Sequence, residues 1–196
     1  MTDKIQKRYI IDEINLPDNF PTHKHDAKFW ESLGRAVATF GFLEEVLSKA
    51  IFVFTGTRQY SEDEVDQAYA EWLPKLERAI VDPLGNLIDA FGKSVRENPS
   101  ATIENLEDLV GDLRKASKIR NVLCHGSWRL PDSGGSSVPF FINRQMEIFE
   151  TAIDISWLNQ VQQHVVSLAC SVINSVTHMG WQFPGSNGPG KIIWKN

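Results

Sequence analysis

Apolar residues recur at spacings of three and four along most of the chain, a pattern typical of helices that pack by one face. The first such stretch runs from about Asp26 to Phe54 and is closed by Thr55-Gly56. This pattern predicts one long helix with a buried side. Its apolar positions are Trp30, Leu33, Val37, Phe40, Leu47, Ile51 and Phe54.

Two shorter helices are predicted in the middle of the chain. Ser61 and Glu64 have the spacing of a capping box and start one helix, in which Pro74 is expected to cause a kink or a restart. The next begins at Asp82-Pro83, a capping residue followed by proline in the first turn, and ends before Asn98-Pro99-Ser100. The expected inward residues are Val65, Tyr69, Trp72 and Leu76 in the first and Leu84, Leu87, Ile88, Phe91 and Val95 in the second.

The last two predicted helices are separated by an irregular segment. The fourth helix runs from about Ile103 to His125 and stops at Gly126. The fifth begins at Asp154 or Ser156 and continues to about His178. Between them, a turn rich in glycine and serine at 131–137 predicts a short, irregular β-hairpin or loop within 127–151.

The predicted fold class is therefore all-α, a helical bundle of about five helices with a β-hairpin or loop insert between the fourth and fifth. With 196 residues, the chain is long enough for one domain with its own core. We expect this domain at 26–180, an N-terminal extension at 1–25 and a flexible C-terminal tail at 181–196.

Two charged residues interrupt apolar stripes. Glu44 lies between Phe40 and Leu47 on the first predicted helix, and Arg120 continues the stripe of Leu113 on the fourth. A charge on a buried stripe is costly unless it is paired or faces a cleft. The pattern predicts an ion pair that fixes the register of the bundle, an arginine held for anion binding, or both, since the two roles do not exclude each other.

Charge is distributed unevenly. The formal net charge of -5 argues against a general nucleic-acid coat protein. The stretch 113–131, however, contains no acid and five bases, which either complement the dipole at the end of a helix or hold phosphate groups. These bases are Arg114, Lys115, Lys118, Arg120 and Arg129.

The remaining composition favours a cytoplasmic protein. Residues 1–8 lack the apolar core of a signal peptide, and no run of about 18 apolar residues predicts a membrane span. Cys124 and Cys170 fall in predicted helices, and we expect free, buried thiols in a reducing compartment. No Cys/His spacing indicates zinc, and His23 and His25 are expected to be solvent-exposed, so no metal or other cofactor is expected.

Three polar residues meet at the end of the fourth predicted helix. Asn121 and His125 are four positions apart and share one helical face, toward which the long side chain of Arg120 can swing. Arginine suits phosphate recognition, and histidine accepts or gives a proton near neutral pH. The three predict an anion site, although His125 alone is also compatible with a simple helix cap.

This segment resembles the Rx4–6H motif of HEPN domains. The matching residues are Arg120-Asn121-Val122-Leu123-Cys124-His125, the form with four intervening residues and asparagine after arginine. Gly126-Ser127-Trp128 and the segment Phe40-Gly41-Phe42-Leu43-Glu44 also resemble HEPN-like proteins of bacterial defence systems. The resemblance covers about 26–178, the whole predicted bundle.

The resemblance implies a metal-independent RNA endonuclease, a toxin or abortive-infection effector that acts as a homodimer with a composite site at the two-fold interface. Arg120 would contact the scissile phosphate, His125 would transfer a proton, Asn121 would orient one of these groups, and Glu44 would orient Arg120. The products would carry a 2′,3′-cyclic phosphate and a 5′-hydroxyl. An antitoxin or a regulatory protein is a further expected class of partner.

Other residues around the motif are candidates for RNA binding. Arg114, Lys115, Lys118 and Arg129 would hold flanking phosphates, and Trp128 would stack on a base unless it belongs to the core. Two alternatives stay open. The domain is a non-catalytic binding or dimerisation module with Glu44 and Arg120 as a buried structural pair, or the same residues bind a nucleotide or another small anion.

Overall fold

The computed structural model describes residues 9–193 and confirms the all-α bundle. Five α-helices are present in this range, and the only β-type pairing within it consists of isolated bridges. The helices are α1 (Ala27–Gly56), α2 (Val65–Val81), α3 (Leu84–Glu97), α4 (Leu106–His125) and α5 (Ile155–Thr177), with short 3₁₀ turns at Glu13–Asn15, Thr22–Lys24 and Glu62–Glu64.

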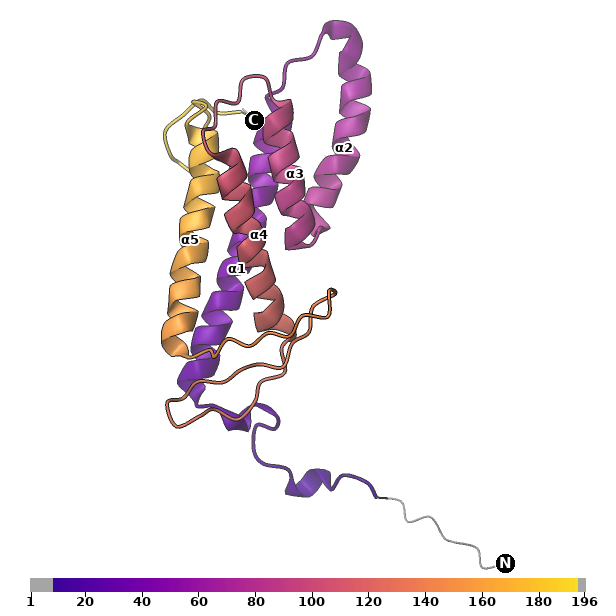
Figure 1. The fold of residues 1–196 in the computed structure, drawn as a ribbon. Helices are drawn as coiled ribbons and strands as arrows, with labels where there is room; N and C mark the ends of the chain where they lie inside the picture. The colour runs from indigo at the N-terminus through magenta and orange to yellow at the C-terminus, as the bar shows by residue number, and fades with distance from the viewer. Residues whose placement is uncertain (1–8, 194–196) are drawn as a thin grey trace, which may run out of the picture.

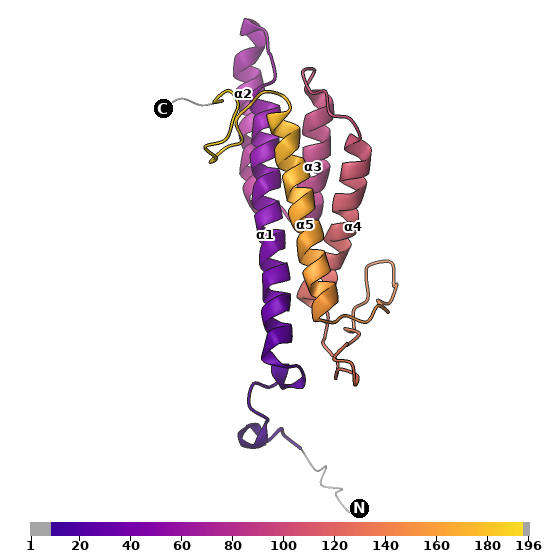
Figure 2. The same cartoon turned by 90° about the vertical axis from the view of Figure 1, so that its left-hand side faces the viewer.

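Helix α1 is the centre of the bundle. It begins where the Asp26 carboxylate accepts a hydrogen bond from the backbone N–H of Phe29 at 2.8 Å. It packs mainly against α5 and α3, and α4 covers the gap between them (Figures 1 and 2). The insert that joins α4 to α5 lies at the end of the bundle where α1 begins (Figure 1).

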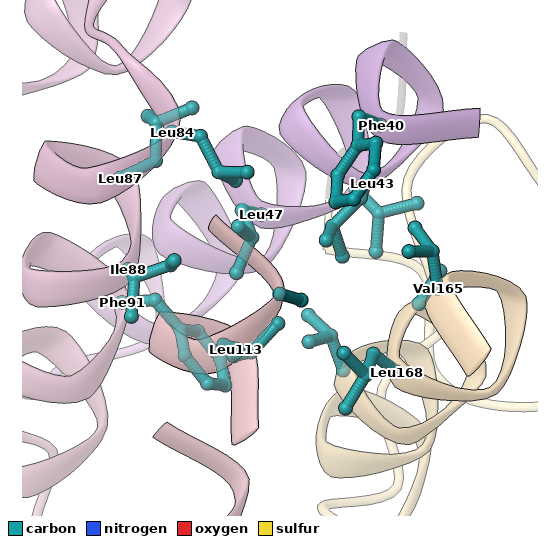
Figure 3. Close-up of a cluster of buried hydrophobic side chains, with 14 of the residues drawn as sticks. Phe40, Leu43, Leu47, Leu84, Leu87, Ile88, Phe91, Leu113, Val165 and Leu168 are labelled. Atoms are coloured by element: carbon teal, nitrogen blue, oxygen red, sulfur yellow. The ribbon is translucent and has the colours of Figure 1, made fainter. Parts of the chain in front are cut away.

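The core is formed by apolar side chains from four helices. Figure 3 shows Phe40, Leu43 and Leu47 of α1 directed toward side chains of α3, α4 and α5. The stripe predicted for α1 is confirmed at most of its positions, but Leu43, Val46 and Val53 are buried as well. The buried surface of α1 is wider than one stripe because this helix has neighbours on several sides.

Helix α2 differs from the prediction. The helix passes through Pro74 without a break, and Val65 and Tyr69, which we expected to point inward, are 49% and 58% exposed. Trp72 is half-buried and donates its indole N–H to Thr55 Oγ1 at 2.8 Å. Val65 and Tyr69 are exposed because α2 lies at the edge of the bundle and packs mainly against α1 (Figure 1). Its neighbours therefore cover only a narrow part of its surface.

Both cysteines are also placed differently from the prediction. Cys124 and Cys170 are free thiols in helices, as expected, but they are exposed. Each follows a buried residue, Leu123 and Ala169 respectively. One step along a helix rotates the side chain by about 100°, which turns both thiols away from the core.

The terminal segments extend the bundle in different ways. Residues 9–22 are exposed and run away from the bundle (Figures 1 and 2). After α5, the chain folds back: Phe183 is 7% exposed within the core, and Trp181 and Ile193 pack against it. The predicted flexible tail is thus packed at these three residues, whereas 185–192 are exposed. Residues 1–8 and 194–196 lie outside the described residues.

His25, expected in solvent, is buried at the start of α1. Its ring stacks on Phe29 with a centroid distance of 3.9 Å, and its Nε2 lies 3.0 Å from the carbonyl oxygen of Arg129. Because a carbonyl only accepts, Nε2–H is the donor of this hydrogen bond. The bond joins the start of α1 to the insert after α4.

We predict that acid weakens the fold through His25. Burial lowers the pKa of His25 below 6.5, although the Arg129 carbonyl and the Asp26 charge oppose this shift. The unfolded chain therefore binds a proton more readily, and the free energy of unfolding falls as the pH drops through 6.5. Denaturant unfolding between pH 8 and pH 5 measures this slope, and His25→Phe is expected to reduce it. An equal slope in the variant would show that other groups control the effect.

Candidate functional site

An open groove with a volume of about 830 Å³ lies at the C-terminal end of α4. One side is the last turns of α4, and the other is formed by the first turn of α3 and the segment 141–149 of the insert. Arg120, Asn121 and His125 all line it. The three residues predicted to form an anion site are thus brought together in one groove.

The position of His125 depends on how α4 ends. His125 is the last residue of the helix, and the N–H of Gly126 donates to the carbonyl of Val122 at 2.8 Å. Gly126 has a φ of -69°, so its backbone is not left-handed and glycine is not required here for that reason. A Cβ at Gly126 would lie 2.6 Å from the Val122 oxygen and 2.9 Å from Pro139 Cβ, so close approach is what excludes a side chain.

Arg120 reaches α1. Its Nη2 lies 3.6 Å from Glu44 Oε1, and each side chain is 29% exposed. The predicted Glu44–Arg120 pair therefore exists, but it is not fully buried, and Glu44 Oε1 accepts no hydrogen bond from the described residues. A guanidinium has five N–H donors, and those of Arg120 make no hydrogen bond within 9–193. The carboxylate thus holds Arg120 electrostatically and leaves its donors available to an anion.

The predicted RNA-binding bases on α4 separate into two groups. Lys118 lines the groove. Arg114 lies outside it and pairs with Asp89 at 2.7 Å, and Lys115 also lies outside and pairs with Asp112 at 2.9 Å. The latter contact raises the pKa of Lys115 and lowers the pKa of Asp112. Among these three bases, only Lys118 is placed to meet a ligand in the groove.

Trp128 and Arg129 also lie outside the groove. The Trp128 ring packs edge-on against Phe29 at a centroid distance of 5.0 Å and joins the core, which favours the structural alternative for this tryptophan. The Arg129 guanidinium lies 5.1 Å above the Phe140 ring. Trp128 thus packs the insert against the bundle, Arg129 contacts another residue of the insert, and neither lines the groove.

The insert contributes groove residues that the sequence interpretation missed. The bridge between Ser127 and Phe140 confirms pairing across the predicted turn, but a second hairpin follows, with a bridge between Ile142 and Ile148. Its polar tip, Asn143-Arg144-Gln145, faces the groove together with Asn86 of α3. The sequence signal for this hairpin is a polar run between two apolar pairs, but many surface loops have the same pattern, so it does not identify a groove.

Comparison of the chain with protein-family models, with curated proteins and with solved structures found no match. Within residues 9–193, no three His, Cys, Asp or Glu side chains are grouped so that they can hold a metal ion. In the same range, no helix combines the length and the apolar character that a membrane crossing requires. The residues of the groove are therefore the basis for a functional proposal.

Proposed function

We propose that this protein is a metal-independent RNA endonuclease of the HEPN type, with Arg120, Asn121 and His125 as its catalytic residues. The observation that carries the proposal is the convergence of these three side chains on one open groove. The groove is rich in positive charge for an acidic chain, since Lys118, Arg120 and Arg144 line it and Glu147 is the single acid among its described lining residues.

The reaction uses the 2′-hydroxyl of the RNA itself as the nucleophile. Its oxygen forms a bond to the adjacent phosphorus, the bond from phosphorus to the 5′-oxygen breaks, and the products are a 2′,3′-cyclic phosphate and a 5′-hydroxyl. Arg120 stabilises the negative charge that develops on the phosphoryl oxygens. His125 transfers one of the two protons, either from the 2′-hydroxyl or to the leaving oxygen. Asn121 shares the face of His125 and orients the phosphate.

A homodimer would complete this chemistry, because one histidine in a groove serves only one of the two proton transfers. A second copy of the chain would supply the other His125 across a two-fold axis. The insert also exposes apolar side chains that do not line the groove, since Met146 is 77% and Phe140 is 48% exposed. An interface with a second copy would cover such exposed apolar side chains.

One observation favours the non-catalytic alternative. The Glu44–Arg120 pair joins α1 to α4 within a single chain, as a device that fixes helix register would. In a purely structural role, however, Arg120 has no reason to share a solvent-open groove with the exposed Asn121 and His125. The open groove therefore supports a role of Arg120 toward a ligand better than a purely structural role.

Incubation of the purified protein with labelled single-stranded RNA in EDTA tests the proposal. We expect cleavage of the RNA and none of DNA with the same sequence, which lacks the 2′-hydroxyl. Cleavage that appears only with added magnesium, or equal cleavage of DNA, would contradict the mechanism. Binding of RNA without cleavage under any condition would favour the non-catalytic module.

A further inference from the structure

The two sides of the groove differ in chemistry. The α4 side carries Lys118, Arg120 and His125, which suit a phosphate. The opposite side adds apolar side chains to the polar tip of the second hairpin: Phe141 and Phe149 line the groove and are half-buried against the core, and Ile148 is 60% exposed. A phosphate alone would leave these apolar side chains uncovered, so the ligand that fits the whole groove has a charged part and a flat, apolar part.

The tip of the second hairpin is held in one conformation by a side chain. Asn143 Oδ1 accepts hydrogen bonds from the backbone N–H groups of Gln145 at 3.0 Å and Glu147 at 2.9 Å. Asn143 Nδ2 donates to the Glu147 carboxylate at 2.6 Å. Glu147, the single acid among the described lining residues, therefore already has a hydrogen-bond partner. The backbone N–H of Phe149 donates to the carbonyl of Phe141 at 3.0 Å and closes the base of the hairpin.

This fixed tip presents two side chains without partners of their own. Arg144 makes no ion pair and Gln145 makes no side-chain hydrogen bond with the residues that the structure describes, whereas Arg114 and Lys115 outside the groove are each paired. Asn86, which lines the same side from α3, also has a free amide within this range. Side-chain amides carry both donors and acceptors and can therefore distinguish the edges of nucleobases.

We propose that the second hairpin, Phe141–Phe149, forms a nucleobase-recognition subsite beside the catalytic residues. One unpaired base of the RNA lies against the apolar side chains of this hairpin, and the amides of Gln145 and Asn86 contact its edge. Arg144 binds the phosphate next to that base. This inference rests on the proposed function only in taking RNA as the ligand, and it adds that the groove binds RNA with one base in this subsite more tightly than RNA with the other bases.

Fluorescence anisotropy with short 2′-O-methyl oligonucleotides of A, C, G or U tests the subsite without cleavage, because the methylated oxygen cannot attack. We expect one base to bind at least about fivefold more tightly than the others. The double variant Asn86→Ala/Gln145→Ala is expected to remove this preference and to change the affinity for the remaining bases by less than about twofold.

Arg144→Ala is expected to behave differently from the amide variant. It weakens binding of all four oligonucleotides by a similar factor and lowers the slope of log affinity against log salt by about 0.7, the value for one phosphate contact on a single strand. Arg144→Lys is expected to keep this slope. Arg114→Ala is the matched control, because it also removes an arginine from the exposed surface, but one outside the groove that is paired with Asp89.

Equal binding of the four bases by the wild type would overturn the subsite, as would a preference that survives in the double variant. An unchanged salt slope in Arg144→Ala would overturn the phosphate contact. These results are separate from those for cleavage. Base-selective binding without cleavage in EDTA supports the subsite and contradicts the ribonuclease. Cleavage without base-selective binding supports the ribonuclease and contradicts the subsite.

Discussion

Replacement of His125 by alanine is expected to reduce the rate of RNA cleavage in EDTA by about 10²–10⁴-fold, the range typical of a lost general acid or base. The fold is expected to be unchanged. The His125 side chain is exposed at the end of α4 and makes no hydrogen bond or ion pair with the described residues, so its removal leaves no buried group without a partner.

The measurement compares single-turnover cleavage of one labelled RNA by the wild type and the variant, together with their thermal unfolding. His164→Ala is the matched control, because His164 is also an exposed helical histidine but lies on α5, outside the groove. An unchanged rate in His125→Ala would remove this residue from the mechanism. A rate that falls together with the melting temperature would indicate a structural role.

Replacement of Arg120 by methionine is expected to have two separable effects. Cleavage should fall by about 10²–10³-fold, since the charge that develops on the phosphate loses its main counter-charge. Stability should fall by about 1–3 kcal/mol, because Glu44 Oε1 is buried, already lacks a hydrogen bond, and would also lose its neighbouring charge.

The double variant Glu44→Leu/Arg120→Met separates these effects. Removal of both charges relieves the unpaired carboxylate, so stability is expected to return to near the wild-type value while cleavage stays lost. Denaturant unfolding and cleavage rates of the two single variants and the double variant provide the comparison. Recovery of cleavage together with stability would mean that Arg120 acts only through the fold.

The sequence predicted the helices well where burial has a regular period. The stripe of α3 is confirmed, because this helix packs against its neighbours by one face. The prediction failed for Val65 and Tyr69 of α2, since an amphipathic pattern does not tell how much of a helix its neighbours cover. It failed for Cys124 and Cys170 because cysteine is usually buried, whereas the angular position of these two on their helices turns them away from the core.

The candidate site was predictable only where it lies on a helix. Asn121 and His125 share a face by helical period alone, and stripe counting offered a pair of Arg120 with Glu44 as one of two interpretations, which the distance between them supports. The other side of the groove depends on the insert, where no period exists and the conformation rests on specific hydrogen bonds of Asn143. Arg144 therefore lies opposite Lys118 through a tertiary arrangement that its neighbours in the sequence do not reveal.

The central claim is that the 2′-hydroxyl of RNA is the nucleophile in this groove. Its most direct test is a cleavable RNA with a single 2′-deoxy substitution at the mapped cleavage position, incubated in EDTA, with the product ends identified by mass spectrometry. We expect the unmodified RNA to yield a 2′,3′-cyclic phosphate and a 5′-hydroxyl, and the substituted linkage to stay intact. Cleavage at the 2′-deoxy linkage, or products with a 5′-phosphate and a 3′-hydroxyl, would contradict it.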